Sequence, residues 1–204
     1  ACLEPPLLTA FCAWEGASEF YRDTTRHGGI MSMFLSTWAP RAVLRVQHGL
    51  GERGPRSAVT GEQVAGPPTL PEEELAKNRI DIEAWILAHL FDDAAYRARS
   101  PEWNKVKVPL LSAANWGGMG LHPRGNFDGY VHSASRQKWL EAHGGAHWEH
   151  FYTAYGEKLQ KKFFGHFLKG ERTGWEEQPP VLLQVRHVDR FVERSENEWP
   201  LART

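Results

Sequence analysis

The sequence predicts an α/β protein whose parallel strands end in loops that carry reactive groups. Residues 106–111 contain the apolar run Val-Lys-Val-Pro-Leu-Leu, and the loop Asn115-Trp116-Gly117-Gly118 follows, as expected for a strand buried in a parallel sheet. A second run, residues 138–143, stops at Gly144-Gly145 and places His147 just beyond its end. In open α/β sheets, reactive groups lie on the loops that follow the carboxyl ends of the strands. We therefore expect the chemistry of the chain in these two loops.

The flanking segments predict further elements of the same fold. Residues 7–14 form an apolar run that is expected to be another strand. Over residues 149–169, aromatic and leucine side chains recur every four residues and lysines gather toward the end, which predicts a sheet-covering helix that stops at Gly170. Beyond Pro180, two alternating runs predict antiparallel strands. Because two strands alone are marginally stable, they are expected to pack on the main body or to begin a larger sheet.

Residues 24–104 have the pattern of a helical insertion between core strands. The first part is rich in Gly, Pro and Arg and lacks periodicity. A capping-box spacing at Thr69 and a run of acidic residues predict a helix over residues 72–91. Asp92-Asp93 is expected to end this helix and to cap a short second one. An insertion of this kind predicts a lid or cap on a sheet enzyme.

The composition excludes several classes of function. With 24 basic and 25 acidic residues, the formal net charge is −1, and no broad positive field exists for nucleic acid or an acidic membrane. No apolar run approaches the ~20 residues of a membrane span, and residues 1–10 lack the regions of a signal peptide. Cys2 and Cys12 are too few for a disulfide framework and are expected to be reduced thiols. We therefore expect a cytoplasmic protein that binds neither nucleic acid nor membrane.

Six segments, in order along the chain, carry a resemblance to a known family. They are AWEGASEFYR (13–22), ARSPEW (98–103), VPLLSAANW (108–116), GGAHW (144–148), FFGHFLKG (163–170) and VLLQVR (181–186). Together they resemble the Xaa-Pro dipeptidyl-peptidase and cocaine esterase family of serine hydrolases, the CocE/NonD family. The resemblance spans nearly the whole chain.

The resemblance implies a fold, an activity and one site residue. Residues 1–178 would form the C-terminal part of an α/β-hydrolase fold, with a helical cap inserted at roughly residues 24–104. Residues 179–204 would form the first strands of a β jelly-roll domain. The family hydrolyses acyl bonds with a Ser, Asp, His triad, and His147 matches its general base. We therefore expect a small-molecule ester or peptide substrate and no cofactor.

The other two triad members depart from the family pattern. Its nucleophile stands on a Gly-x-Ser-x-x-Gly turn, which these 204 residues do not contain, so Ser18 is predicted to be a helix cap. Its triad aspartate lies two residues after the tryptophan of the strand-end loop, where this chain has Gly118. Asp128, in a predicted helix, is the nearest acid downstream and the remaining candidate. These departures predict the middle of a longer enzyme, with missing polypeptide segments or a homo-oligomer as partner.

A second function stays open, as does the role of two tryptophans. Without a nucleophile, the chain could be a non-catalytic remnant that binds a small acyl ligand or a partner subunit. Trp116 and Trp148 are expected either to line an apolar substrate pocket or to pack in the core. Residues 49–56 have the glycines of a phosphate loop without its Lys-Ser/Thr ending, and are predicted to be a turn-rich loop.

A metal site at the histidine-rich loop is the other alternative. His143, His147 and His150 are suitably spaced for it, but Gly144-Gly145 disfavours the helix that would bring them to one face. The order His-Trp-Glu-His also differs from the zinc-protease motif. We therefore expect no metal at these three histidines.

Overall fold

The chain folds into two compact units. The computed structural model describes residues 1–43, 50–64, 70–118 and 120–202. Unit 1 comprises Ala1–Asp23 and Tyr96–Thr204, and unit 2 comprises Thr24–Ala95. Unit 1 is therefore one compact body although unit 2 interrupts it in the sequence.

Unit 1 is built on a five-stranded, mostly parallel sheet with the order β1-β4-β5-β6-β7. Its strands are β1 (Phe11–Trp14), β4 (Leu110–Asn115), β5 (Lys138–His143), β6 (Val181–Arg186) and β7 (Phe191–Glu196). The first four run parallel to their neighbours, and β7 is antiparallel to β6. The predicted α/β class is confirmed, and β5 has the predicted bounds.

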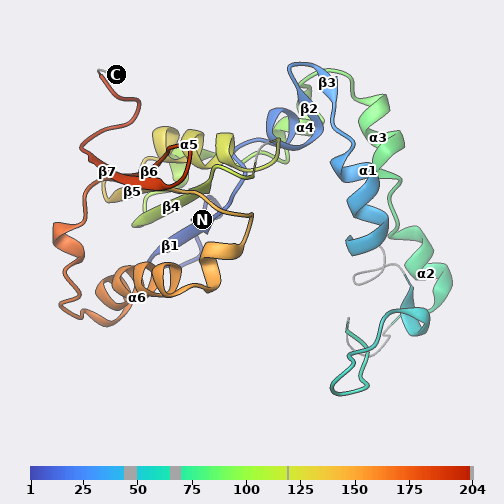
Figure 1. Ribbon diagram of the computed structural model, residues 1–204. Helices are drawn as coiled ribbons and strands as arrows, with labels where there is room; N and C mark the ends of the chain where they lie inside the picture. Colours follow the sequence, from blue (N-terminus) through green and yellow to red (C-terminus); the bar gives the residue numbers. More distant parts are fainter. Residues whose placement is uncertain (44–49, 65–69, 119, 203–204) are drawn as a thin grey trace. The chain divides into compact units, whose positions relative to one another are not determined.

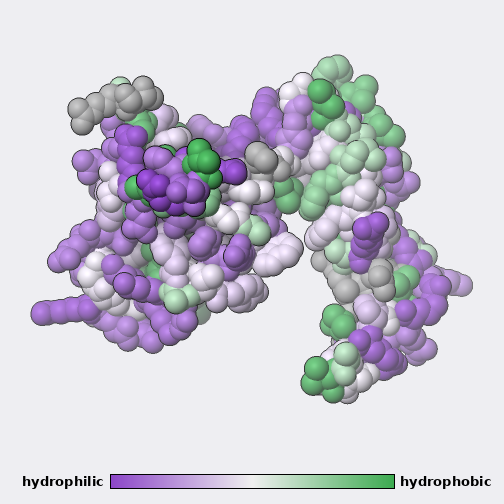
Figure 2. Space-filling model, in the orientation of Figure 1, coloured by the Kyte–Doolittle hydropathy of each residue, from purple (hydrophilic) through white to green (hydrophobic). Residues whose placement is uncertain are grey.

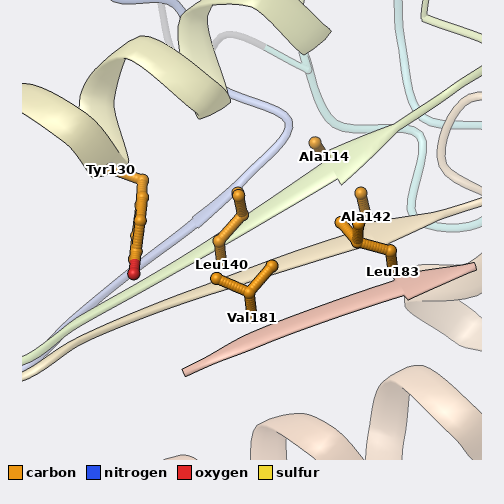
Figure 3. Packing of buried hydrophobic residues seen from close by; sticks show 6 residues of the cluster. All are labelled: Ala114, Tyr130, Leu140, Ala142, Val181 and Leu183. Atoms are coloured by element: carbon orange, nitrogen blue, oxygen red, sulfur yellow. The ribbon is translucent and has the colours of Figure 1, made fainter. Parts of the chain in front are cut away.

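Two helices, α5 (Pro123–His132) and α6 (Ala154–Lys169), cover opposite faces of this sheet (Figure 1). On the face of α5, Tyr130 packs with small and branched side chains of three neighbouring strands (Figure 3): Ala114, Leu140, Ala142, Val181 and Leu183. On the face of α6, Leu159 and Phe163 pack with Leu111 and Trp175. Because both faces are covered, β4 is buried along its whole length, as an inner parallel strand should be.

The helix predicted over residues 149–169 consists of two pieces. A 3-10 turn, η5 (Glu149–Tyr152), comes first, and α6 begins after Thr153, whose side chain accepts a hydrogen bond from the Gly156 N–H. Thr153 has an extended backbone, so it interrupts the helical conformation between η5 and α6 and caps the start of α6. Gly170, with φ of 66°, ends α6 in the left-handed conformation, as predicted.

The remaining elements are short, and most belong to unit 2. They are η1 (Tyr21–Thr25), β2 (Arg26–His27), β3 (Ile30–Met31), α1 (Phe34–Trp38), η2 (Ala39–Val43), η3 (Gly51–Arg53), α2 (Glu72–Lys77), α3 (Ile82–Ala88), α4 (Ala94–Arg97), η4 (Trp103–Lys105) and η6 (Trp175–Glu177). Residue 49 of the turn-rich loop predicted over residues 49–56 lies outside the described residues, and the described part contains η3.

The single helix predicted over residues 72–91 is wrong, because the chain forms α2 and α3 with a break between them. Asp81 has an extended backbone and accepts a hydrogen bond from the Ala84 N–H, so it caps a new helix. Thr69, the predicted cap of the first helix, lies outside the described residues. Asp93 accepts from the Ala95 N–H at the start of α4, as the sequence predicts.

Ser18 does not cap a helix. The Asp23 carboxylate instead accepts hydrogen bonds from the N–H groups of Ser18 and Glu19, at 2.6 and 2.9 Å, and from the Ser18 hydroxyl. Asp23 lies inside η1, and its buried carboxylate binds the N–H groups of two residues ahead of that element. The Ser18 hydroxyl thus donates to a side chain and does not accept from a helix N–H.

Unit 2 buries few hydrophobic side chains for its size. Among its described residues, the buried ones are Leu35, Ala39, Leu75 and Ile86. Figure 2 shows hydrophobic residues on its surface around β3 and α3, where Ile30 and Leu87 are exposed. Both large hydrophobic clusters lie in unit 1.

The two C-terminal strands extend the main sheet. β6 pairs with β5, and β7 pairs with β6 along its full length. The pair therefore packs on the main body, which was one of the two expected arrangements. Within the described residues, no helix is both long and apolar enough to span a membrane.

Candidate active site

The carboxyl ends of three neighbouring parallel strands bring polar side chains to one edge of the sheet. Glu15 directly follows β1, Asn115 ends β4 and His143 ends β5. The register pairs Trp14 with Ala113 and Asn115 with His143, so the three side chains start at the same edge. This is the edge at which α/β sheets bind ligands.

Glu15 has an unusual backbone conformation that is held from both sides. Its φ is 59°, in the left-handed region that costs a residue other than glycine on the order of 1–2 kcal/mol. The Glu15 N–H donates to the Ala113 carbonyl at 2.8 Å, and the Gly16 N–H donates to Asn126 Oδ1 at 2.9 Å. Such strain is often found at functional sites.

His147 lies in the loop after β5 and contacts the Glu15 carboxylate. Its Nδ1 is in contact with Glu15 Oε2. The Glu15 side chain is only 4% exposed, whereas that of His147 is 37% exposed. A carboxylate at Nδ1 favours the tautomer that carries its proton there, so Nε2 has a free lone pair. The pair therefore has the arrangement of a general base and the acid that orients it.

Close packing fixes the loop that carries His147. Asn115 Nδ2 donates to the Gly144 carbonyl at 3.0 Å. At Gly117, a Cβ atom would lie 2.6 Å from the Gly145 carbonyl oxygen and 2.9 Å from Asn115 Oδ1. Only glycine allows this approach of the two strand-end loops.

His122 completes the cluster from the start of α5. Its ring lies nearly parallel to that of His147, with centroids 5.1 Å apart and 10° between the planes. Burial, and next the proximity of His147, lower the pKa of His122, against the opposing effect of Glu15. His122 is therefore held mainly as a neutral imidazole.

A second acid–histidine pair lies behind Glu15. Glu141, 1% exposed, accepts a hydrogen bond from the Tyr155 hydroxyl at 2.9 Å and contacts His143 Nδ1 at 2.8 Å. His143 Nε2 lies 4.0 Å from Glu15 Oε1. Burial, followed by the charge of Glu141, raises the pKa of Tyr155 and raises that of the Cys12 thiol to about 12. Both groups are therefore neutral at physiological pH, and both cysteines are free.

Asp128, the predicted candidate for the triad acid, pairs with Arg124 and not with His147. It lies in α5, as predicted, and its Oδ2 is 2.7 Å from Arg124 Nη2 and 3.3 Å from the Ser18 hydroxyl. Arg124 also pairs with Asp23. The charge of Asp128 is thus balanced by arginine, and the carboxylate that contacts His147 belongs to Glu15.

The two tryptophans that were expected at a substrate pocket have different surroundings. Trp116 Nε1 donates to the Gln184 carbonyl at 2.7 Å, and its ring stacks on Phe127 at the border of a core cluster. Trp148 is 66% exposed, and its ring lies edge-on to that of His147. Trp148 is the one that lies beside the candidate base.

The histidine-rich loop contributes one residue to a group with metal-ligand geometry. Among the described residues, the group is Glu15, His122 and His147, whose ligand atoms lie within 4.8 Å of one another. It differs from the set considered from the sequence, because His143 is paired with Glu141 and the His150 ring packs against His143.

Glu15 and His122 were not predicted as site residues, although a signal for Glu15 is present in the sequence. Glu15 is an acid between the end of an apolar strand and a glycine, as a strand-end functional residue would be. His122 stands before Pro123 at a helix start, and no sequence pattern links it to His147. The sequence alone does not show which strand-end loops are neighbours.

Comparisons with known proteins agree with this architecture. Two crystal structures of a CocE/NonD family hydrolase from Staphylococcus aureus are similar to the chain, with TM-scores of 0.79 and 0.77 and 29% sequence identity in both. They cover 99% and 98% of this chain, which spans 32% of the length of each. The chain matches no protein-family model and no curated protein. The family resemblance seen in the sequence is confirmed by these structures.

Proposed function

From the similarity to CocE/NonD family hydrolases, we propose that this chain supplies the general base and its orienting acid to an acyl hydrolase, a peptidase or esterase. His147 is the base and Glu15 is the acid. The observation that carries the proposal is the contact between His147 Nδ1 and the buried Glu15 carboxylate at the carboxyl edge of a parallel sheet.

The chemistry assigned to these groups is that of a serine hydrolase. A serine hydroxyl attacks the acyl carbonyl while His147 Nε2 accepts its proton. The base then gives this proton to the leaving alkoxide or amine, and a water molecule hydrolyses the acyl-enzyme by the same steps. Glu15 retains its charge throughout and stabilises the imidazolium that forms.

The nucleophile in this proposal comes from a polypeptide segment outside these 204 residues. The family's Gly-x-Ser-x-x-Gly turn does not occur among them. Among the described residues β1 pairs only with β4, so its other edge can accept another parallel strand. A strand at that position would end beside Glu15, at the edge where His147 lies.

The test compares variants of the full-length gene product that contains this chain. We expect His147→Gln and Glu15→Gln each to lower kcat/KM for aryl esters or Xaa-Pro amides by about 10⁴-fold, because the base is lost or wrongly oriented. Fluorophosphonate labelling reports the serine, and circular dichroism reports folding. A folded Glu15→Gln protein with full activity would refute the acid role.

Asp128→Asn is the matched comparison, since Asp128 is the acid that the sequence offered. If it causes the larger loss in kcat/KM, Asp128 orients His147 and Glu15 does not. If the full-length protein neither labels nor hydrolyses esters and amides, the chain is instead a non-catalytic remnant that binds an acyl ligand or a partner.

A further inference from the structure

We propose that Glu15, His122 and His147 form a binding site for a transition-metal cation, with Zn²⁺ as the preferred ion. The proposal concerns metal binding by this chain and does not depend on the proposed hydrolase activity. It starts from the donor set, because two imidazoles and one carboxylate are a common ligand set of three-ligand zinc sites.

The three side chains come from three loops that meet at one edge of the sheet. Glu15 follows β1, His122 precedes α5 and His147 follows β5. One ligand atom from each lies within 4.8 Å of the others. Tetrahedral zinc with bonds of about 2.1 Å places its ligand atoms about 3.4 Å apart. Side-chain shifts of roughly 1 Å would therefore bring the three ligand atoms to the separations of a tetrahedral zinc site.

The donor atoms are buried and poorly satisfied by the protein. Within the described part of the chain, both Glu15 oxygens, His122 Nδ1 and His147 Nδ1 lack a well-formed hydrogen bond, although Glu15 Oε2 and His147 Nδ1 are in contact. Burying a polar atom without a hydrogen bond is unfavourable. A cation that accepts lone pairs from all three residues removes this cost.

The surroundings favour ligation and access. The His122 ring lies nearly parallel to that of His147, with centroids 5.1 Å apart, so both imidazoles are held at the Glu15 cluster. The His147 side chain is partly exposed, so an ion can reach the cluster and keep a water molecule as fourth ligand.

Metal binding and the proposed base role exclude each other. Zinc on His147 Nδ1 occupies the position of the proton that Glu15 holds there. In an active full-length protein, Zn²⁺ should therefore inhibit, and a chelator should restore the rate.

The test is calorimetric titration of the 204-residue protein with Zn²⁺, with Co²⁺ absorption as the spectroscopic readout. We expect one tight equivalent and a visible spectrum typical of four-coordinate Co²⁺. Glu15→Gln, His122→Gln and His147→Gln should each weaken binding at least about 100-fold, since loss of an outer partner alone costs 10–100-fold. His166→Gln is the matched control, because His166 pairs with Glu176 outside the cluster.

The outcomes separate this inference from the proposed function. Absence of a tight equivalent, or tight binding that His122→Gln leaves unchanged, would overturn the metal site. Zinc binding by a protein without hydrolase activity leaves it standing. Should Glu15→Gln fail to fold by circular dichroism, His122→Gln carries the test, because His122 is only partly buried and forms no ion pair in the described residues.

Discussion

Glu15 lies next to the position at which the family resemblance places the triad acid. A Cβ atom added to Gly118 would be 3.7 Å from Glu15 Oε2. Residue 118 and residue 15 follow neighbouring strands, β4 and β1, so either can present a carboxylate to the loop of His147. In the proposed hydrolase, the triad acid follows β1 instead of the neighbouring β4, and it still orients the base His147.

Moving the acid back to residue 118 should restore activity. We expect Glu15→Ala in the full-length protein to lose about 10⁴-fold in kcat/KM, and the double variant Glu15→Ala/Gly118→Asp to recover at least about tenfold. Gly118 does not have a positive φ, and its nearest neighbours would be 3.4 Å from the new Cβ, so aspartate fits with small adjustments.

Kinetics with a chromogenic ester measure this recovery. Glu15→Ala/Gly118→Asn is the control, because asparagine has the same shape without the charge. A folded aspartate double variant that is no faster than Glu15→Ala would contradict the exchange of positions.

The candidate site could be predicted only in part, and the reason lies in contacts between loops. His147 was identified because the motif around it resembles a known family. Glu15 belongs to another matched motif, but its role depends on β1 lying beside β4, and its effect on His147 depends on the fold of the loop after β5. Asp128 was selected by its distance along the chain, whereas Arg124, one helical turn away, balances its charge.

At the scale of elements, α5 connects the parts of the site. Asn126, 2% exposed, donates from Nδ2 to the Ala13 carbonyl and accepts from the Gly16 N–H, so it links the helix to the end of β1. His122 starts the same helix. The position of α5 thus decides how closely His122 approaches Glu15.

Gly125 lets α5 approach this turn, and alanine there should be destabilising despite its higher helix propensity. Its Cβ would lie 2.5 Å from Ala17 Cα and 2.6 Å from the Ser18 nitrogen, which are backbone atoms. We expect Gly125→Ala to lower the free energy of unfolding by about 1–3 kcal/mol and to weaken Zn²⁺ binding, because the helix must move outward.

Urea unfolding and the zinc titration measure these two effects. His132→Ala, at an exposed position of the same helix, should change stability by less than about 0.5 kcal/mol. A Gly125→Ala protein that is as stable as the parent would show that the helix packs less closely than described.

The elements that were predicted well have strong local signals. A glycine pair follows the end of β5, and α6 ends at a left-handed glycine. Local residue types therefore predict where these two elements end. The helix predicted over residues 72–91 failed because Asp81 caps a new helix inside a periodic pattern. An aspartate on the polar side of such a pattern is compatible with one helix or with two, and local periodicity does not decide between them.

At the scale of the molecule, the sheet and the insertion differ in how they are stabilised. Both large hydrophobic clusters and every residue of the candidate site belong to unit 1, whereas the described part of unit 2 buries few apolar side chains. The sequence predicted an insertion from the loss of periodicity after residue 24. The loss of hydrophobic periodicity predicts where the elements of the main core end. It does not predict how the side chains of the insertion pack.

Unit 1 should therefore fold without the insertion. The two points at which the chain leaves and re-enters it are close, since the Tyr96 ring is 5.0 Å from that of Tyr21 and 5.9 Å from that of Phe20. Replacing residues 25–94 by a short Gly/Ser linker should leave one cooperative thermal transition, because closing a short loop there costs little entropy. The deletion should also retain the tight Zn²⁺ equivalent, whose ligands all lie in unit 1.

A longer deletion, of residues 25–97, is the control: it also removes Tyr96, which is fully buried, and should unfold at a lower temperature. Non-cooperative melting of the shorter deletion would mean that unit 1 needs the insertion to fold.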